Sequence, residues 1–156
     1  MSGARHRTRR HQARPIRKVG ATRRARARRG YARGVAKILI VDDDQDTRQL
    51  LKIRLESTGY ETAFAWDAVT AISATREERP DLILLDFGLP GGDAVVVMER
   101  LQTFPALAGT PVVVVSAREP SATEQRALAA GAVAYVQKPI DNEQLLGAIR
   151  SALGEV

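Results

Sequence analysis

Several features that define other classes of protein are missing from this chain of 156 residues. It contains no cysteine, which excludes disulfides and thiolate metal sites. None of its apolar runs approaches the roughly 18–20 residues needed to span a bilayer. The N-terminus also lacks the apolar centre of a secretory signal. We therefore expect a soluble, cytoplasmic protein without membrane insertion.

Acidic residues are absent from the first 36 positions, which nevertheless hold 13 of the 24 Lys and Arg residues. The remaining 120 residues hold 11 basic and 18 acidic residues, a formal charge of −7. The net charge of +6 therefore describes neither part of the chain. We interpret residues 1–36 as a basic, disordered extension with too few apolar residues to fold. Residues 37–156 have the length of one domain, enough to bury about two thirds of its unfolded surface.

The basic extension leaves three interpretations open. Its arginines attract nucleic acid or another anionic surface through phosphate contacts and counterion release. Alternatively, the extension is a solvated tail without a partner. In the third interpretation, translation begins at Val35 from a GUG codon, and residues 1–34 are not part of the protein.

From Lys37 onward, short apolar runs alternate with segments of helical periodicity. The expected strands cover residues 37–41, 60–66, 81–85, 111–115 and 133–136. Five helices are expected between and after these strands. The first follows the first strand and ends near residue 58, and the others cover 67–80, 94–103, 121 or 123 to 131, and 141–153. Asp67 is expected to cap the second helix, and Asp141 with Gln144 resembles a capping box for the last.

Five such repeats predict an α/β fold with a flavodoxin-like, doubly wound parallel sheet in strand order 2-1-3-4-5. The continuously apolar run at 82–85 is typical of a strand that is covered on both faces. The segment 95–97 consists of three valines, which favour a strand by propensity. Only its place in the alternating pattern indicates a helix there.

Charged side chains follow the expected strands. Asp42 and Asp43 follow the first strand and Asp86 follows the third, while Lys138 follows the fifth. At an effective dielectric of about 20, two carboxylates about 4 Å apart repel by roughly 4 kcal/mol. Such a cluster is reasonable where a divalent cation and an ammonium share the site. The pattern therefore indicates a site that handles a phosphoryl group.

The chain over residues 37–156 resembles the receiver domain of two-component response regulators. Each motif alone is weak, but their order and spacing are specific. The motifs that carry the resemblance are KILIVDDD at 37–44, PDLILLDFGLPG at 80–91, VVVVSA at 112–117 and YVQKP at 135–139.

The resemblance implies that Asp86 is the phosphoacceptor. It implies that the Mg²⁺ site is formed by Asp42 (through water), Asp43, Asp86 and the backbone carbonyl of Gly88. Oxygen ligands of this kind suit Mg²⁺, which shares its coordination sphere with phosphate. The remaining implied roles are phosphoryl binding by Ser116 and Lys138, a switching aromatic at Tyr135, and a cis peptide between Lys138 and Pro139.

The expected function is that of a single-domain response regulator. It receives a phosphoryl group from a histidine kinase or histidine phosphotransfer protein and signals through an unknown downstream protein. Self-phosphorylation from a phosphodonor with Mg²⁺ and slow loss of the group are its only expected reactions, so it is not expected to be an enzyme in the usual sense. The alternative is a nucleic-acid-associated protein that binds through the basic extension.

Three further residues have simpler interpretations. Asp44 and Asp93 are expected to cap helices. The single tryptophan, Trp66, leaves partner contact and ordinary packing open as alternatives.

Overall fold

The computed structural model describes residues 34–155. The basic extension expected at 1–36 therefore lies, up to residue 33, outside the described residues. The strands of the described part are β1 (Lys37–Val41), β2 (Glu61–Ala65), β3 (Leu82–Asp86), β4 (Val112–Ser116) and β5 (Ala134–Gln137). Its helices are α2 (Gln45–Ser57), α3 (Ala68–Glu78), α4 (Ala94–Gln102), α5 (Pro120–Ala129) and α6 (Asn142–Leu153). None of these helices has both the length and the apolar character of a membrane span.

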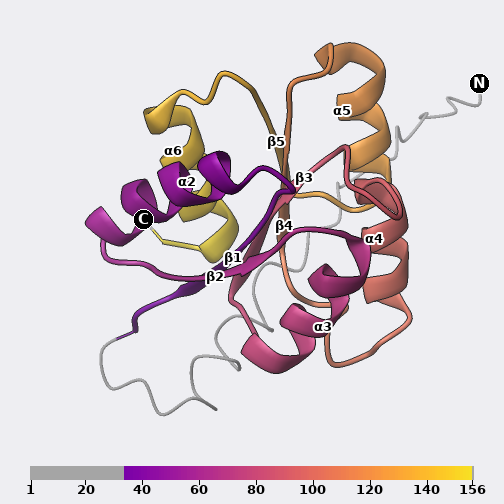
Figure 1. Cartoon of the computed structure of the whole chain (residues 1–156), viewed down its shortest axis with the longest axis horizontal. Helices are drawn as coiled ribbons and strands as arrows, with labels where there is room; N and C mark the ends of the chain where they lie inside the picture. Colours follow the sequence, from indigo (N-terminus) through magenta and orange to yellow (C-terminus); the bar gives the residue numbers. More distant parts are fainter. Residues whose placement is uncertain (1–33, 156) are drawn as a thin grey trace, which may run out of the picture.

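The strands form one parallel sheet in the order β2-β1-β3-β4-β5, which confirms the predicted topology. Figure 1 shows α2 and α6 on one side of the sheet and α3, α4 and α5 on the other. Each strand is followed by a helix that returns the chain to the amino edge. All carboxyl ends of the strands therefore lie at the same edge, where ligands bind in sheets of this type.

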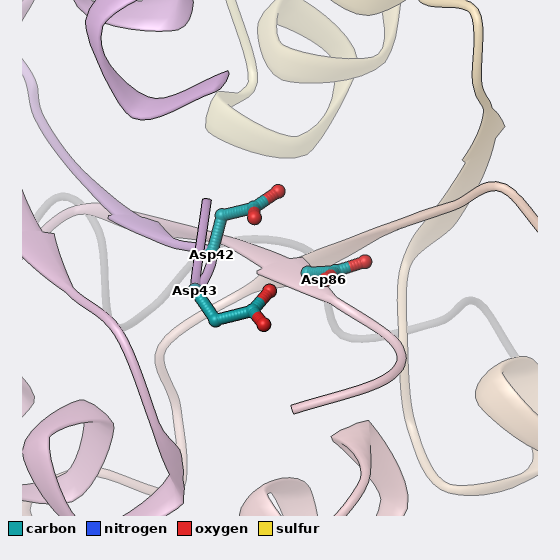
Figure 2. A group of neighbouring side chains, drawn as sticks. All are labelled: Asp42, Asp43 and Asp86. Carbon is teal, nitrogen blue, oxygen red and sulfur yellow. The ribbon is translucent and has the colours of Figure 1, made fainter. Parts of the chain in front are cut away.

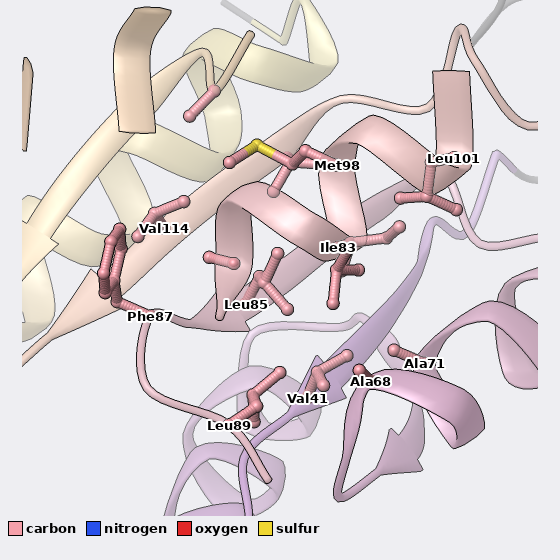
Figure 3. Packing of buried hydrophobic residues seen from close by; sticks show 14 of the residues in the cluster. Val41, Ala68, Ala71, Ile83, Leu85, Phe87, Leu89, Met98, Leu101 and Val114 are labelled. Carbon is pink, nitrogen blue, oxygen red and sulfur yellow. The ribbon is translucent and has the colours of Figure 1, made fainter. Parts of the chain in front are cut away.

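The core has two halves, one on each face of the sheet. In β1, Ile38 and Ile40 face the half beneath α2 and α6, whereas Leu39 and Val41 face the half that contains α3 and α4. All four side chains are almost fully buried, as expected for a central parallel strand. Figure 3 shows the second half, in which Phe87 packs near Val114 at the end of the sheet that carries the site.

The predicted strand boundaries differ from the structure by about one residue. β3 begins at Leu82, because the side chain of Asp81 takes over the hydrogen bonding at the start of the ladder. The backbone N–H of Lys37 donates to Oδ2 of Asp81, and the N–H of Asp81 donates to the carbonyl of Lys37, both at 2.8 Å. β3 and β4 also end one residue later than predicted, so Asp86 and Ser116 are their last residues rather than the first loop residues.

One predicted helix start is wrong. α5 begins at Pro120, so neither Ser121 nor Thr123 opens it, and its cap position has no side-chain hydrogen bond. Proline is well suited to the first helical position because its missing N–H has no partner there in any helix. Asp141 caps α6 by accepting from the N–H of Gln144, although the reciprocal half of a capping box is not formed.

The other helix predictions are confirmed. Asp67 forms a complete capping box with Thr70 at the start of α3. α4 covers Ala94–Gln102 despite its three valines, because Val97 is buried in the core and the burial outweighs propensity.

Candidate functional site

Three carboxylates lie together at the carboxyl edge of the sheet. Val41 and Leu85 are paired in the parallel register of β1 and β3, so the residues that follow them are neighbours. Asp42, Asp43 and Asp86 each place one carboxylate oxygen within 4.8 Å of the others. Figure 2 shows the three side chains projecting from the ends of the two strands. The cluster is made of hard oxygen donors and fits a magnesium ion.

An ammonium group lies beside two of these acids. Nζ of Lys138 donates to Oδ2 of Asp42 at 2.9 Å and lies 3.6 Å from Oδ1 of Asp86. The backbone N–H of Lys138 donates to the carbonyl of Ser116 at 2.7 Å, which fixes the start of the turn. The Lys138–Pro139 peptide is cis, as the resemblance implied.

The electrostatics of the cluster change the acidity of its members. Burial raises the pKa of Asp86 to about 6, and the charges of Asp42 and Asp43 act in the same direction. The ammonium of Lys138 opposes this rise without cancelling it. Burial by itself would lower the pKa of Lys138, but its contacts with Asp42 and Asp86 raise that pKa above its usual value.

The position of Asp42 is determined by backbone contacts as well as by Lys138. Its Oδ1 accepts from the N–H of Asp44 at 2.9 Å, and its carbonyl accepts from the guanidinium of Arg48 at 2.7 Å. Asp42 is only 3 % exposed, whereas Asp43 is exposed. Sequence reasoning missed Arg48, although its position in the first turn of the helix after the acidic motif is a usable signal.

Asp44 does not join the acidic cluster. Its side chain caps α2 by accepting from the N–H of Asp46, and it also accepts from the hydroxyl of Thr47 at 2.6 Å. The hydrogen bond from Thr47 holds the pKa of Asp44 below its usual value. The predicted separation of roles within the acidic motif is therefore confirmed for Asp44.

Ser116 and Tyr135 meet at the backbone of Arg118. Oγ of Ser116 accepts from the N–H of Arg118 at 3.1 Å, and the hydroxyl of Tyr135 donates to the carbonyl of Arg118 at 3.2 Å. Ser116 is 1 % exposed. Gly88 lies in the loop directly after β3, and Nη2 of Arg118 is 3.4 Å from the position that a Cβ on Gly88 would occupy.

Asp93 and Trp66 do not belong to the acidic cluster. Asp93 caps α4, as predicted, and also pairs with Arg126 of α5 at 3.2 Å. The ion pair was missed because its partners are 33 residues apart and belong to no shared motif. Trp66 is 51 % exposed, so packing accounts for only half of its surface.

A doubly wound parallel sheet with clustered aspartates and one lysine at its carboxyl edge places hard oxygen ligands and an ammonium where sheets of this class bind ligands. Residues 38–150 match the response regulator receiver domain family. The chain belongs to this family and contains the receiver domain of a response regulator of two-component signalling.

Proteins similar in sequence to this chain include two response regulators. The chain is 37 % identical over 117 residues to the DNA-binding response regulator MtrA of Mycobacterium leprae. This alignment covers 75 % of this chain and 51 % of that protein. It is 35 % identical over 116 residues to the response regulator PleD of Caulobacter vibrioides, covering 74 % of this chain and 26 % of PleD. The chain thus spans about half of the length of the MtrA proteins and about a quarter of PleD.

Solved structures show the same fold. A putative response regulator from Chloroflexus aurantiacus superposes with a TM-score of 0.74 at 26 % identity, over 78 % of this chain and 99 % of the other. A CheY-like receiver domain protein from Methanospirillum hungatei superposes with a TM-score of 0.70 at 30 % identity, over 77 % of this chain and 94 % of the other.

Proposed function

We propose that the carboxylate of Asp86 accepts a phosphoryl group and that the chain signals through the change that follows. The observation that supports this proposal is the grouping of three carboxylate oxygens within 4.8 Å, with the ammonium of Lys138 touching two of the acids. Such mutual repulsion is unfavourable in a structural site, and it favours a site that receives cationic and phosphoryl groups.

The proposed transfer is a displacement at phosphorus. An oxygen of Asp86 forms a bond to phosphorus as the bond from phosphorus to the imidazole nitrogen of a phosphohistidine breaks. The imidazole leaves with the electron pair and takes a proton from water. With a pKa of about 6, Asp86 is mainly ionised at neutral pH and is available as a nucleophile.

The surrounding residues are assigned by what they can contribute to this step. We assign a magnesium site to Asp42, Asp43, Asp86 and the backbone carbonyl of Gly88; Mg²⁺ would neutralise charge on the transferred group. Lys138 pairs with a phosphoryl oxygen, and Ser116 donates its hydroxyl to another. Tyr135, linked to Ser116 through the backbone of Arg118, responds to any movement of that hydroxyl.

Partners follow from the same chemistry. The proposed donor is a histidine kinase or a histidine phosphotransfer protein, which places the reaction in the cytoplasm where such donors are phosphorylated. A downstream protein then recognises the phosphorylated form. Self-phosphorylation from a small phosphodonor and slow hydrolysis are the only reactions assigned to the chain itself.

A second candidate function rests on the basic extension. We propose residues 1–36 as a region separate from the receiver domain at 37–156. With 13 basic residues and no acid, the extension suits nonspecific binding to nucleic acid. Retention on DNA that is lost with salt, survives Asp86→Asn and disappears on deletion of residues 1–34 would favour this function.

The primary proposal is tested by incubating the protein with acetyl phosphate and Mg²⁺ and locating the added phosphoryl mass. We expect one phosphoryl group on Asp86 in the wild type and none in Asp86→Asn. Asp44→Asn is the matched control, because it removes a neighbouring acid that caps α2 outside the cluster. Labelling of Asp86→Asn to the wild-type extent would refute the assignment.

A further inference from the structure

Two consecutive residues, Asp42 and Asp43, contribute carboxylates to the same cluster. In an extended chain, successive side chains point to opposite faces of the sheet. Asp42 directly follows β1, and the chain bends at Asp43, so that both carboxylates lie near that of Asp86 (Figure 2). The orientation of the peptide between Asp42 and Asp43 therefore decides whether both acids can serve one ion.

The guanidinium of Arg48 holds this peptide. Nη1 of Arg48 donates to the carbonyl oxygen of Asp42 at 2.7 Å, from a half-buried position in the first turn of α2. The backbone N–H of Arg48 also donates to the carbonyl of Asp44, at 3.1 Å. A hydrogen bond from a charged donor is shorter and stronger than one between neutral groups. Arg48 therefore ties the acidic motif, residues 42–44, to the first turn of the helix that follows it.

The carboxylate of Asp43 depends on its backbone for its position. Asp43 is exposed, and among residues 34–155 its carboxylate takes part in no ion pair or hydrogen bond. The peptides on both sides of Asp43 are held. Arg48 contacts the carbonyl of the first, and Oδ1 of Asp42 accepts from the N–H of the second, that of Asp44, at 2.9 Å. Arg48 is thus a side chain from outside the acidic motif that fixes the backbone of Asp43.

The charge of Arg48 does not neutralise the acids directly. Within the part of the chain that the structure describes, no ion pair joins its guanidinium to a carboxylate, although it contacts the backbone of Asp42. The ammonium that pairs with Asp42 belongs to Lys138, at 2.9 Å. A cation that contacts a neutral carbonyl within an acidic motif acts on the geometry of that motif.

We infer that Arg48 is a positioning residue for the proposed metal site, which fixes the Asp42–Asp43 peptide and thereby directs the carboxylate of Asp43 toward Mg²⁺. The inference rests on the proposed function, because it assumes that the acidic cluster holds the ion. Arg48 itself contacts neither the ion nor the phosphoryl group. Residues that orient a metal ligand in this way commonly have a marked effect on metal affinity.

The direction of the change in Mg²⁺ affinity separates positioning from a charge effect. Removal of a cation near three carboxylates makes the site more negative, which by itself would strengthen Mg²⁺ binding. Arg48→Gln removes the charge and, because glutamine is shorter, the contact with the Asp42 carbonyl. We expect it to bind Mg²⁺ about fivefold more weakly than the wild type, the effect of one net hydrogen bond.

Arg48→Lys keeps the charge but replaces the planar fork of the guanidinium by a single ammonium. Its Mg²⁺ affinity should lie between those of the wild type and Arg48→Gln. Any loss in this variant is a loss of geometry, so it decides the question even if Arg48→Gln does not fold. Circular dichroism checks the fold of each variant, and calorimetric titration of the full-length chain with Mg²⁺ gives the affinities.

Arg54→Gln is the matched control. Arg54 lies on the same helix and donates to the carbonyl of Ile140 at 3.4 Å, outside the acidic motif. The Mg²⁺ affinity of this variant should stay within about twofold of the wild type. Unchanged or tighter binding by Arg48→Gln (by Arg48→Lys, if the former does not fold) would overturn the inference. An equal loss in Arg54→Gln would also overturn it, because it would indicate a general effect of charge on α2.

A double-mutant cycle tests whether Arg48 acts through Asp43. Once Asp43→Ala has removed the ligand, adding Arg48→Gln should change the Mg²⁺ affinity by less than about twofold. A further loss as large as that in the wild-type background would overturn the inference and leave the metal site and the phosphoacceptor as proposed. Failure of the wild type to bind Mg²⁺, or to become phosphorylated on Asp86 from acetyl phosphate, would overturn the proposed function and this inference with it.

Discussion

The two ends of β3 each carry an aspartate, and the two residues act on the fold in opposite ways. At the amino end, Asp81 is buried and exchanges hydrogen bonds with the backbone of Lys37, which joins β3 to β1. At the carboxyl end, Asp86 faces two other acids, and its pKa is raised to about 6. The same residue type therefore stabilises one edge of the sheet and destabilises the other.

This contrast indicates where the molecule has been arranged for folding and where for binding. The amino edge pairs its charges internally, as Lys37 does with the carboxylate of Glu78 at 2.9 Å. The carboxyl edge concentrates three carboxylates, and the ammonium of Lys138 offsets only part of their negative charge. Strain of this kind, tolerated because the rest of the core is well packed, is characteristic of functional sites.

The largest expected effect is on stability, when each aspartate is removed in turn. Asp81→Ala should lower the free energy of unfolding by about 2–3 kcal/mol, because the partly buried N–H of Lys37 loses its acceptor. Asp86→Ala should raise it by about 1 kcal/mol in metal-free buffer, because it relieves repulsion and desolvation. Urea unfolding of the three proteins provides the measurement. A loss of stability in Asp86→Ala equal to that in Asp81→Ala would remove the contrast between the edges.

A smaller effect is expected on metal binding. Asp43→Ala should weaken Mg²⁺ binding about tenfold while the fold remains as stable or becomes more stable, because one of three clustered acids is lost. The fluorescence of Trp66 offers a readout, since the preceding residue, Ala65, accepts a hydrogen bond from the N–H of Asp42 at 3.1 Å. Asp44→Ala serves as the control outside the cluster. An unchanged Mg²⁺ affinity in Asp43→Ala would show that this acid is not a ligand.

The pH dependence of stability should separate the edges further. The folded-state pKa of Asp86, about 6, lies above its ordinary value of 3.8, so the folded protein binds the proton more tightly. Its contribution to stability is fully present below that ordinary value and is lost as the pH rises through about 6. We expect metal-free wild type to lose about 1–2 kcal/mol between roughly pH 4 and pH 7, relative to Asp86→Asn.

Comparison with Asp86→Asn is needed because other carboxylates titrate in the same range. Denaturation at a series of pH values, with and without Mg²⁺, gives the two curves. Parallel curves for the wild type and the variant would show that the Asp86 carboxyl is not perturbed in solution.

The fold was predictable because local patterns and tertiary packing agree almost everywhere. The apolar run at 82–85 and the alternation with helices were enough for the sheet and its strand order. Errors arose where a single side chain decides a boundary, as when Asp81 replaces a backbone partner or Pro120 begins α5. Such details depend on a three-dimensional neighbour that no local window contains.

The residues that make up the candidate site were predictable from the sequence, whereas several of the contacts around it were not. The acids and Lys138 could be located because each follows a strand, and parallel strands bring their carboxyl ends together. The contact of Arg126 with Asp93 and the position of Arg118 over Phe87 depend on helix packing and loop geometry. No spacing rule in the sequence encodes those contacts.

The smallest effect is expected when the basic extension, residues 1–34, is removed from the acidic domain. A chain beginning at Val35 should phosphorylate from acetyl phosphate within about twofold of the full-length rate at roughly 0.15 M salt, where the Debye length is about 8 Å. Its stability should also be unchanged, because a segment with few apolar residues buries too little surface to offset the entropy of ordering. Ala36, which is buried and accepts a hydrogen bond from the N–H of Glu61, is retained in the shorter chain.

The salt dependence of the two rates decides between a bystander and a regulatory extension. The domain carries −7 and the extension is strongly basic, so any docking between them should strengthen at low salt. If the extension is a bystander, the ratio of the two rates stays near one at every salt concentration. A ratio that departs severalfold from one at about 0.15 M salt, and returns toward one as salt is added, would make residues 1–34 an electrostatic regulator of the site.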